Sequence, residues 1–464
     1  MTASETNIDL RTPRRIHIVG LGGAGMSAIA EVLLGTGHRV SGSDLKSSAP
    51  LERLAEAGVI AHVGHVADQI GDAEIVAIST AIPDTNPEVV AANAAGVPVL
   101  RRAEILAAIT RAWRTISVAG THGKTTTSAM LTIALQGAEM DPAFIVGGDL
   151  VDLARGAAVG SGEMLVVEAD ESDGTFIELE SAAVIVTNVE PDHLEHYGGF
   201  EALQRAFVQF VDQASGPRLV CIDDPGARSL LADRQGVTTY GLDPGADWRI
   251  VDPLPTPLGV NFDVVSGGDR FHIALGQPGL HNARNAAAAL AMTVLLGGDG
   301  VLSAAALSAF GGVGRRFERR GEVDGITFVD DYAHLPTEVA AALQAAASTE
   351  PGRLVTVFQP HRYSRTEQLW SSFTHSFVGA DVLFVTGIYA SGEAPRAGIS
   401  GSLIADDVMK AHPDADIRYI ESLDDVITAL ADELVTGDLC LTLGAGDLTT
   451  IPDRVIAAVE AKQR

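Results

Sequence analysis

The chain contains the stretch Ser117-Val118-Ala119-Gly120-Thr121-His122-Gly123-Lys124-Thr125-Thr126-Thr127, in which an apolar run gives way to two glycines and then to a helical pattern. The residues from Thr115 to Ala119 predict a short buried strand, and the pattern from Lys124 onward predicts a helix. Backbone N–H groups at the start of a helix point at anions, and the helix dipole favours negative charge there. The stretch therefore predicts a phosphate-binding loop between a strand and a helix.

The polar side chains of this loop suit a nucleotide. Lys124 would reach the terminal phosphates, and the Thr125 hydroxyl would coordinate Mg²⁺. Position 118 is Val, so the loop is shorter than the common Gly-x4-Gly-Lys-Ser/Thr form. A tight turn with a surface lysine is the alternative, but it leaves the flanking strand and helix unexplained. The residues predicted to bind the nucleotide here are Gly120, Thr121, His122, Gly123, Lys124, Thr125 and Thr126.

Length and charge limit the possible functions. A chain of 464 residues is expected to hold about three domains of ordinary size. The net charge of -28 argues against nucleic acid or an anionic membrane as a partner. Cys221 and Cys440 lie in apolar runs, and the N-terminus lacks a hydrophobic signal segment. We therefore expect a cytoplasmic protein without a disulfide framework or a membrane span.

The first predicted domain, residues 1–113, carries a second glycine loop. A strand ends at Gly20 and is followed by Gly-Leu-Gly-Gly-Ala-Gly and a helix, and a second strand leads to Asp44. This arrangement is the signature of a dinucleotide site, which keeps an NAD-dependent oxidoreductase open, but such loops also hold UDP-sugars. The expected ligand contacts are Gly20, Gly22, Gly23 and Gly25, with Ser43 or Asp44 nearby.

The second predicted domain, residues 114–316, has an acidic strand end. Glu168, Asp170, Glu171 and Asp173 lie within six residues and would repel one another unless a cation sits among them. Glu168 is nearest the strand and is our choice for a Mg²⁺ ligand beside Thr125. A solvated acidic loop remains the alternative for one or two of the four.

Other residues of this domain extend the predicted nucleotide site. His193 follows the strand that ends at Asn188, and its position parallel to Glu168 makes it a candidate metal ligand. Asn282 and Asn285 share one face of a helix start, where an ordinary N-cap and polar face is an equal alternative. Residues 248–274 predict an antiparallel patch. Arg316, in a glycine-rich basic hinge, is expected to touch phosphate.

The third predicted domain, residues 317–464, alternates strands and helices in the parallel manner. Two of its strands end in polar groups: Asp331 and His334 follow the first, and Arg362 and Arg365 follow the next. These ends meet at one sheet edge, where the arginines can grip a carboxylate with paired hydrogen bonds. A structural salt bridge is the alternative for one of the two arginines.

Taken together, these motifs resemble the Mur ligases, the ATP-dependent amide-forming enzymes of peptidoglycan precursor synthesis. The resemblance covers essentially the whole chain and rests on the following motifs: His17 to Ser27, Gly120 to Thr126, Glu168, Asn188 to His193, His281-Asn282-x-x-Asn285, Gly314 to Phe317, Asp330 to His334, and Gln359 to Arg365. It implies an α/β fold of three domains. These are a Rossmann-like N-terminal domain, a P-loop ATPase domain with a parallel sheet and a small antiparallel patch, and a Rossmann-like C-terminal domain.

The resemblance also implies substrates and roles. The chain is similar to the branch of the family that joins L-alanine to the lactoyl carboxylate of UDP-N-acetylmuramate through an acyl phosphate. The branch that recycles murein tripeptide is the alternative. ATP and Mg²⁺ are the implied cofactors, and a monomer or weak homodimer is expected. The implied residue roles are adenine or ATP contact for His281, Asn282 and Asn285, phosphate contact for Arg316, amino-acid binding for His334, Arg362 and Arg365, support of that site for Asp331, and metal ligation for Thr125, Glu168 and His193.

Two departures from the family pattern stand out. Leu335 occupies the second position of a motif that usually reads His-His-Pro, so we assign it no function. The segment Arg205 to Phe210 holds no lysine where sister ligases carry a carbamylated one, so completion of a second metal site stays open. A non-catalytic nucleotide switch is a third class of function, which the arginine-rich edge of the third domain disfavours.

Overall fold

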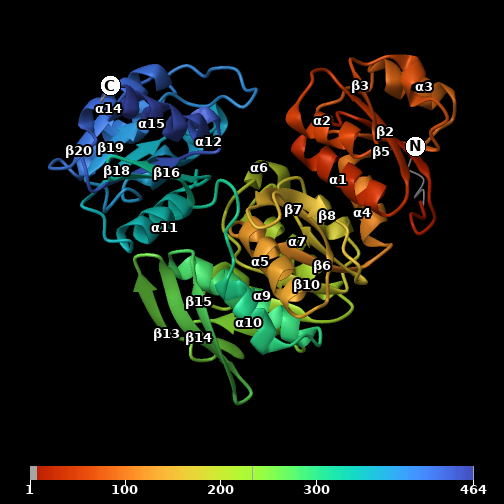
Figure 1. Cartoon of the computed structure of the whole chain (residues 1–464), viewed down its shortest axis with the longest axis horizontal. Helices are drawn as coiled ribbons and strands as arrows, with labels where there is room; N and C mark the ends of the chain where they lie inside the picture. Colours follow the sequence, from red (N-terminus) through yellow and green to blue (C-terminus); the bar gives the residue numbers. More distant parts are fainter. Residues whose placement is uncertain (1–7, 232–233, 463–464) are drawn as a thin grey trace. The chain divides into compact units, whose positions relative to one another are not determined.

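A computed structural model describes residues 8–231 and 234–462 (Figure 1). Contacts divide the chain into two compact units. The first unit comprises the chain up to residue 251 with 263–273 and 284–310, and the second comprises 252–262, 274–283 and the chain from 311 onward. We describe each unit by itself.

The N-terminal sheet of the first unit is fully parallel. Its strand order is β3-β2-β1-β4-β5, so the chain reverses its direction of travel across the sheet between β1 and β4. Ligands of open α/β sheets bind at such a switch point, and the first glycine loop follows β1 there. The strands are β1 (Arg15–Val19), β2 (Arg39–Asp44), β3 (Ile60–Val63), β4 (Ile75–Ile78) and β5 (Val99–Arg101), and the helices α1 (Ala24–Gly35), α2 (Ala49–Glu56), η1 (Ala67–Ile70), α3 (Pro87–Ala94) and α4 (Arg102–Thr110).

The second sheet is larger and has the order β15-β14-β13-β12-β11-β10-β6-β9-β7-β8. Strands β7, β9, β6, β10, β11 and β12 run parallel, whereas β8 pairs antiparallel with β7. The strands are β6 (Arg114–Ala119), β7 (Ala143–Leu150), β8 (Arg155–Ala158), β9 (Met164–Glu168), β10 (Ala183–Val186), β11 (Arg218–Cys221), β12 (Thr238–Gly241), β13 (Trp248–Thr256), β14 (Gly259–Ser266) and β15 (Asp269–Leu275). The helices are α5 (Lys124–Gly137), η2 (Thr175–Glu178), α6 (Leu194–Tyr197), α7 (Phe200–Asp212), α8 (Pro225–Ser229), α9 (Leu280–Leu295) and α10 (Gly300–Ser308).

The antiparallel patch expected over residues 248–274 corresponds to β13, β14 and β15. These strands are neighbours in the sheet and are joined by turns at residues 257–258 and 267–268, which are too short for a parallel crossover. Gly267 and Gly268 both adopt positive φ, 58° and 100°, as the tight turn between β14 and β15 requires.

The third sheet lies in the second unit and has the order β16-β17-β21-β18-β19-β20, parallel except for the β16–β17 hairpin. Apolar clusters cover both of its faces. The strands are β16 (Glu318–Val323), β17 (Ile326–Asp331), β18 (Arg353–Phe358), β19 (Val382–Val385), β20 (Asp416–Tyr419) and β21 (Asp438–Leu443). The helices are α11 (Pro336–Ala347), α12 (Tyr363–Leu369), η3 (Trp370–Phe373), α13 (Ser402–Ala411), α14 (Leu423–Glu433), η4 (Asp447–Thr450) and α15 (Ile451–Lys462). The predicted α/β class with parallel sheets is thus confirmed.

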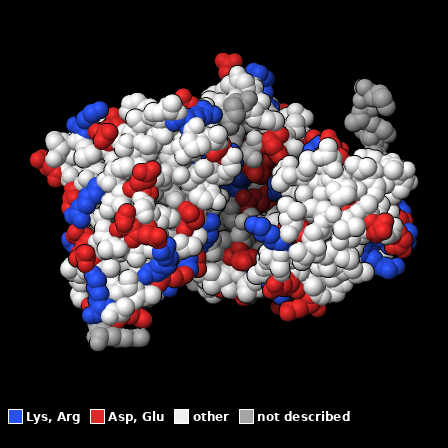
Figure 2. Space-filling model, turned by 90° about the horizontal axis from the view of Figure 1, so that it is seen from above, with Lys and Arg blue, Asp and Glu red and all other residues white. Residues whose placement is uncertain are grey.

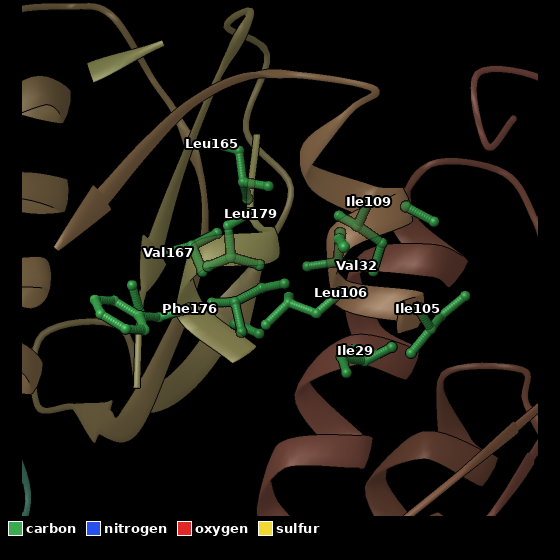
Figure 3. Close-up of a cluster of buried hydrophobic side chains, with 14 of the residues drawn as sticks. Ile29, Val32, Ile105, Leu106, Ile109, Leu165, Val167, Phe176 and Leu179 are labelled. Atoms are coloured by element: carbon green, nitrogen blue, oxygen red, sulfur yellow. The ribbon is translucent and has the colours of Figure 1, made fainter. Parts of the chain in front are cut away.

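The first two sheets share one hydrophobic cluster (Figure 3). Helix α1 packs on β7 and β8, and α4 packs on η2. The side chains that meet there are Ile29, Val32, Ile105, Leu106, Ile109, Leu165, Val167, Phe176 and Leu179, all of them buried. The two glycine loops therefore belong to one compact unit although the sequence predicts them in separate domains.

Surface charge, helix composition and the two cysteines bear on the partners and chemistry open to this protein. Acidic and basic side chains are interspersed on the face drawn in Figure 2, with no broad basic area. None of the described helices is long and apolar enough to cross a membrane. Cys221 and Cys440 are free and buried, and burial raises the pKa of the Cys221 thiol to about 11. Both thiols are therefore poor nucleophiles.

The shared cluster generates a stability prediction. Leu106→Ala leaves a cavity between α4 and the second sheet and should lower the free energy of unfolding by about 2–5 kcal/mol, measured by urea denaturation. Leu254→Ala, at a side chain that is 62% exposed, is the matched control and should change it by less than about 0.5 kcal/mol. Equal effects of the two substitutions would contradict the packing described here.

Candidate functional site

The phosphate loop is shaped by two glycines with left-handed or unusual φ. Gly120 has φ of 141° and Gly123, the N-cap of α5, has φ of 78°. A Cβ atom on Gly120 would lie 2.0 Å from Thr187 Oγ1, and one on Gly123 would lie 2.9 Å from Asn285 Oδ1. Side chains are therefore excluded from both positions, which leaves the backbone N–H groups at the start of α5 open to an anion.

The end of β10 holds the loop in this shape. The Asn188 side chain accepts a hydrogen bond from the His122 N–H at 2.7 Å and donates one to the His122 carbonyl at 3.0 Å. The Thr187 hydroxyl donates to the same carbonyl at 2.6 Å. Thr187 was not among the predicted site residues; its place directly after β10, a strand that neighbours β6, is the feature of the sequence that could have indicated it.

Lys124 is paired inside the loop. Its ammonium donates to the Gly120 carbonyl at 2.8 Å and to the two carboxylate oxygens of Glu171 at 2.8 and 3.1 Å. Burial lowers the pKa of Lys124, but the charges of Glu171 and Asp170 outweigh it and the pKa is raised. Burial raises the pKa of Glu171, and the Lys124 charge only partly opposes this. The pairing of Glu171 with the loop lysine was not predicted.

Thr125 and Glu168 lie together as the sequence predicts for a metal pair. The Thr125 hydroxyl donates to one Glu168 oxygen at 3.0 Å, and the Gly147 N–H donates to the other at 2.6 Å. Two oxygen donors in contact suit the hard cation Mg²⁺. His193, with φ of 53°, has its ring nitrogen 3.2 Å from the Asp192 carboxylate. Within the described residues no group of three or more His, Cys, Asp or Glu side chains is arranged to hold a metal ion.

The four acids at the end of β9 and directly after it have different contacts. Glu168 and Glu171 face the loop, as described above. Asp170 accepts hydrogen bonds from the N–H and hydroxyl of Ser172, and Asp173 accepts them from Thr175. The alternative of a solvated acidic loop therefore describes the exposed Asp173 but not Asp170, which is half-buried.

The first glycine loop is held by the end of β2. The N–H groups of Gly20 and Leu21 both donate to the Ser43 carbonyl at 2.9 Å, and the Gly22 N–H donates to the Asp44 carboxylate at 2.8 Å. Asp44 therefore contacts the backbone of the first glycine loop, and its expected contact with the ligand stays a prediction. The Ser43 hydroxyl points the other way and donates to the buried Glu88 at 2.7 Å.

Glu88 is the centre of a buried polar cluster that sequence reasoning missed. Its carboxylate oxygens lie 3.3 Å from His17 Nε2 and 2.9 Å from His65 Nδ1. Burial raises the pKa of Glu88, but the hydrogen bonds with His17 and Ser43 outweigh it and the pKa is lowered. The cluster ties β1, β2 and α3 together beneath the glycine loop and gives His65, which the sequence analysis left aside, a structural task.

The predicted adenine residues lie at the start of α9. Asn285 belongs to the first unit and touches the phosphate loop at Gly123. His281 and Asn282 fall in the second unit, where the Asn282 amide donates to the Pro278 carbonyl at 2.8 Å. Asn282 already lies inside α9 and donates this bond, whereas the N-cap that the sequence left as an equal alternative would accept one from a backbone N–H.

In the second unit, Asp331 lies at the carboxyl end of β17 and is half-buried. It accepts hydrogen bonds from the N–H groups of Phe317 at 2.7 Å and Ala333 at 2.8 Å. Burial, opposed by the charge of Arg316, raises the pKa of Asp331 to about 6. The guanidinium of Arg316 stacks on the Tyr332 ring, 4.9 Å from its centroid. Asp331 thus fixes the segment that carries Arg316.

His334, Arg362 and Arg365 meet around a histidine that was not predicted. The His334 ring lies 5.5 Å from that of His361, whose Nδ1 lies 3.0 Å from Arg365 Nη1. Burial and the neighbouring His334 lower the pKa of His361 to about 3, so its ring is neutral and can accept that bond. Arg362 has φ of 67°, and its buried Nε has no hydrogen-bond partner among the described residues.

Leu335 is buried in the second unit, 5% exposed, at the N-cap of α11. The Glu338 carboxylate accepts hydrogen bonds from the N–H groups of His334 at 3.0 Å and Leu335 at 3.1 Å. The backbone at this turn is therefore satisfied by Glu338, and position 335 needs no polar side chain.

Comparison with known proteins matches three family models along the chain. They are "Mur ligase family, catalytic domain" over residues 15–114, "Mur ligase middle domain" over 118–293 and "Mur ligase, glutamate ligase domain" over 315–446. A UDP-N-acetylmuramate–L-alanine ligase of Nitratidesulfovibrio vulgaris is 44% identical over 96% of this chain and 98% of its own length. One from Thermobifida fusca is 42% identical over 96% of each chain.

Two solved structures are similar over nearly the full length. A UDP-N-acetylmuramate-alanine ligase from Thermotoga maritima has a TM-score of 0.81 and 29% identity, covering 97% of this chain and 100% of its own. A murein peptide ligase from Psychrobacter arcticus has a TM-score of 0.68 and 25% identity, covering 96% and 98%.

The raised pKa of Asp331 generates a pH prediction. Since its pKa is raised, the folded state holds a proton that the unfolded state releases, so this group's contribution to stability falls as pH rises from about 4 to about 6. Asp331→Asn should remove that fall. The difference in unfolding free energy between variant and wild type should then change by about 2 kcal/mol between pH 4 and pH 7 in urea denaturation. Asp414→Asn, at an exposed site, is the control; the same change in both variants would contradict the assignment.

Proposed function

Because the chain belongs to the Mur ligase family, we propose that it catalyses ATP-dependent amide formation between the lactoyl carboxylate of UDP-N-acetylmuramate and L-alanine. The single observation that carries this proposal is the 44% identity, over 96% of the chain, to an enzyme named for that reaction. The product is a precursor of peptidoglycan, so the protein is a ligase of cell-wall synthesis. This reaction takes place between small molecules, and we infer a cytoplasmic enzyme that works as a monomer or weak homodimer.

Each part of the chain has a proposed substrate. Residues 1–113 would bind the UDP-sugar through Gly20, Gly22, Gly23 and Gly25, with Asp44 at the loop. Residues 114–316 would bind ATP, and residues 317–464 would bind the amino acid. The proposal is supported by the glycine loop at a sheet switch point, the phosphate loop at the start of α5, and the arginine pair at the carboxyl edge of the third sheet.

The phosphate loop fits ATP, and its neighbours fit Mg²⁺. The fit to phosphate rests on the two glycines whose geometry excludes a Cβ, and the fit to Mg²⁺ on the contact between Thr125 and Glu168. Thr125 and Glu168 are the proposed ligands, with His193 as a third candidate. When bound, Mg²⁺ would offset the negative charge of the phosphates.

The proposed reaction has two steps. The lactoyl carboxylate attacks the terminal phosphorus of ATP, so that ADP leaves and an acyl phosphate forms. The amine of L-alanine then attacks the acyl carbon, phosphate leaves, and the amine proton passes to water. Lys124 and Arg316 would stabilise charge on the transferring phosphoryl group, and no covalent enzyme nucleophile is needed. Positioning and electrostatics would therefore supply much of the rate.

The amino-acid site is proposed around His361. Arg362 and Arg365 would bind the carboxylate of L-alanine, because guanidinium groups form paired, charge-assisted hydrogen bonds with carboxylates. The unpartnered Nε of Arg362 supports this role. His334 would line the same site, and Asp331 would support it through the backbone of residues 317 and 333. Exclusion of glycine in favour of L-alanine would rest on one methyl group, worth about 1–3 kcal/mol.

Recycling of murein tripeptide is the second candidate. It is favoured by the structural similarity to a murein peptide ligase, whose TM-score of 0.68 is lower than the 0.81 of the L-alanine ligase. The test is phosphate release from ATP and UDP-N-acetylmuramate in the presence of Mg²⁺, with a panel of L-amino acids and with tripeptide. Release that depends on L-alanine supports the proposal. Release only with tripeptide would replace it with the recycling reaction.

Lys124 yields the first kinetic prediction. Lys124→Ala should lower kcat for ADP formation by about a hundredfold or more, because a cation facing the transferring phosphoryl group is lost. Binding of UDP-N-acetylmuramate, measured by calorimetry, should stay close to wild type. Lys462→Ala, at an exposed lysine, is the control. Unchanged turnover in Lys124→Ala would end the assignment of this loop to ATP.

Arg362 yields the second kinetic prediction. Arg362→Ala should raise the KM for L-alanine by about ten- to a hundredfold, the value of a charge-assisted hydrogen bond, with little change in the KM for ATP. Arg396→Ala removes an exposed arginine from the same unit and should leave both constants unchanged. An effect confined to the KM for ATP would place Arg362 outside the amino-acid site.

A further inference from the structure

Glu171 contacts the lysine of the phosphate loop, and the proposed mechanism gives it no role. It lies three residues beyond Glu168, its side chain is 2% exposed, and both of its carboxylate oxygens contact the Lys124 ammonium. Its other acceptors are the Gly120 carbonyl at 2.8 Å and, at the longer distance of 3.5 Å, the Thr121 carbonyl. An ammonium group has three protons to donate, so these contacts account for all of them.

The backbone of Glu171 is fixed by two hydrogen bonds to its carbonyl. Its carbonyl accepts hydrogen bonds from the Tyr197 hydroxyl at 2.5 Å and from the Gly174 N–H at 3.0 Å. Tyr197 lies in α6, which begins directly after His193. The position of the Glu171 carboxylate over Lys124 is therefore supported by the fold around it.

A nucleotide cannot reach Lys124 without changing this arrangement. A phosphate oxygen that binds the ammonium must replace one of its present acceptors. The Gly120 carbonyl belongs to the loop backbone that shapes the site, whereas Glu171 is a side chain that carries charge of the same sign as the phosphate. Repulsion between carboxylate and phosphate makes Glu171 the acceptor that is replaced.

We propose that Glu171 is a positioning residue that holds Lys124 in the loop and competes with the terminal phosphates of ATP for its ammonium. The affinity for ATP is then the difference between the Lys124–phosphate and Lys124–Glu171 interactions. Asp170 adds to this, because its charge also acts on Lys124 while its own hydrogen bonds are made to Ser172. This inference rests on the proposed binding of ATP to the loop.

The test is direct binding of ADP and ATP to the full chain, measured by calorimetry, with Glu171→Gln as the variant. The amide keeps the size of the side chain and removes its charge, so both nucleotides should bind about tenfold more tightly, the value of one charged hydrogen bond. The KM for ATP should fall in parallel, and the KM for L-alanine should not change. A role limited to holding the fold together would not tighten nucleotide binding.

Asp173→Asn is the matched control, because it removes the same charge from the same segment, where the carboxylate contacts only Thr175 among the described hydrogen bonds. Its effect on nucleotide affinity should be small. Equal tightening in both variants, or no tightening in Glu171→Gln, overturns the inference. Absence of nucleotide binding by the wild-type chain would instead overturn the proposed function.

A second measurement needs no variant. In a structure of the wild-type chain with ADP, Lys124 should contact the terminal phosphate, and the Glu171 carboxylate should lie beyond hydrogen-bond distance of its ammonium. Retention of the Lys124–Glu171 contact beside bound ADP overturns the inference, and this decides the matter if Glu171→Gln does not fold.

Discussion

The parallel register of three strands in the second sheet is the constraint on which the ATP site depends. β6 lies between β9 and β10, with Val118 opposite Glu168 and Ala119 opposite Val186. The phosphate loop leaves β6 at this level, so it emerges between an acid on one side and a threonine and asparagine on the other. The contacts of Thr125 with Glu168 and of His122 with Asn188 follow from that register. A shift of one residue would turn these side chains to the opposite face of the sheet.

Much of this arrangement is predictable from the sequence because it depends on strand ends. Glycine loops, acids and arginines that follow apolar runs mark the carboxyl edge of a parallel sheet, and the structure has them there. The family and the reaction follow from the same residues, and the comparisons support both. The positions of the strand ends were sufficient to predict that Thr125 lies near Glu168 and that His334 lies near Arg365.

The remainder depends on how the chain turns after each strand, which no residue spacing encodes. Of the three acids that follow β9, Glu171 faces Lys124 and Asp173 closes a local turn, although only two residues separate them. Ser43 offers its carbonyl to the glycine loop and its hydroxyl to Glu88. His361 was missed because a histidine beside two arginines has no distinctive pattern, and its neutral state follows only from burial.

The hydrophobic cluster between the first two sheets bears on how this protein can be divided. In soluble proteins, domain borders drawn from sequence often coincide with polar, weakly packed junctions. Here the border near residue 113 runs beside buried leucine, isoleucine, valine and phenylalanine side chains contributed from both directions. A fragment ending there would present the apolar faces of α1 and α4 to water, a surface prone to self-association. The first sheet is thus separate in its topology, but its apolar surface stays covered only when the second sheet is present.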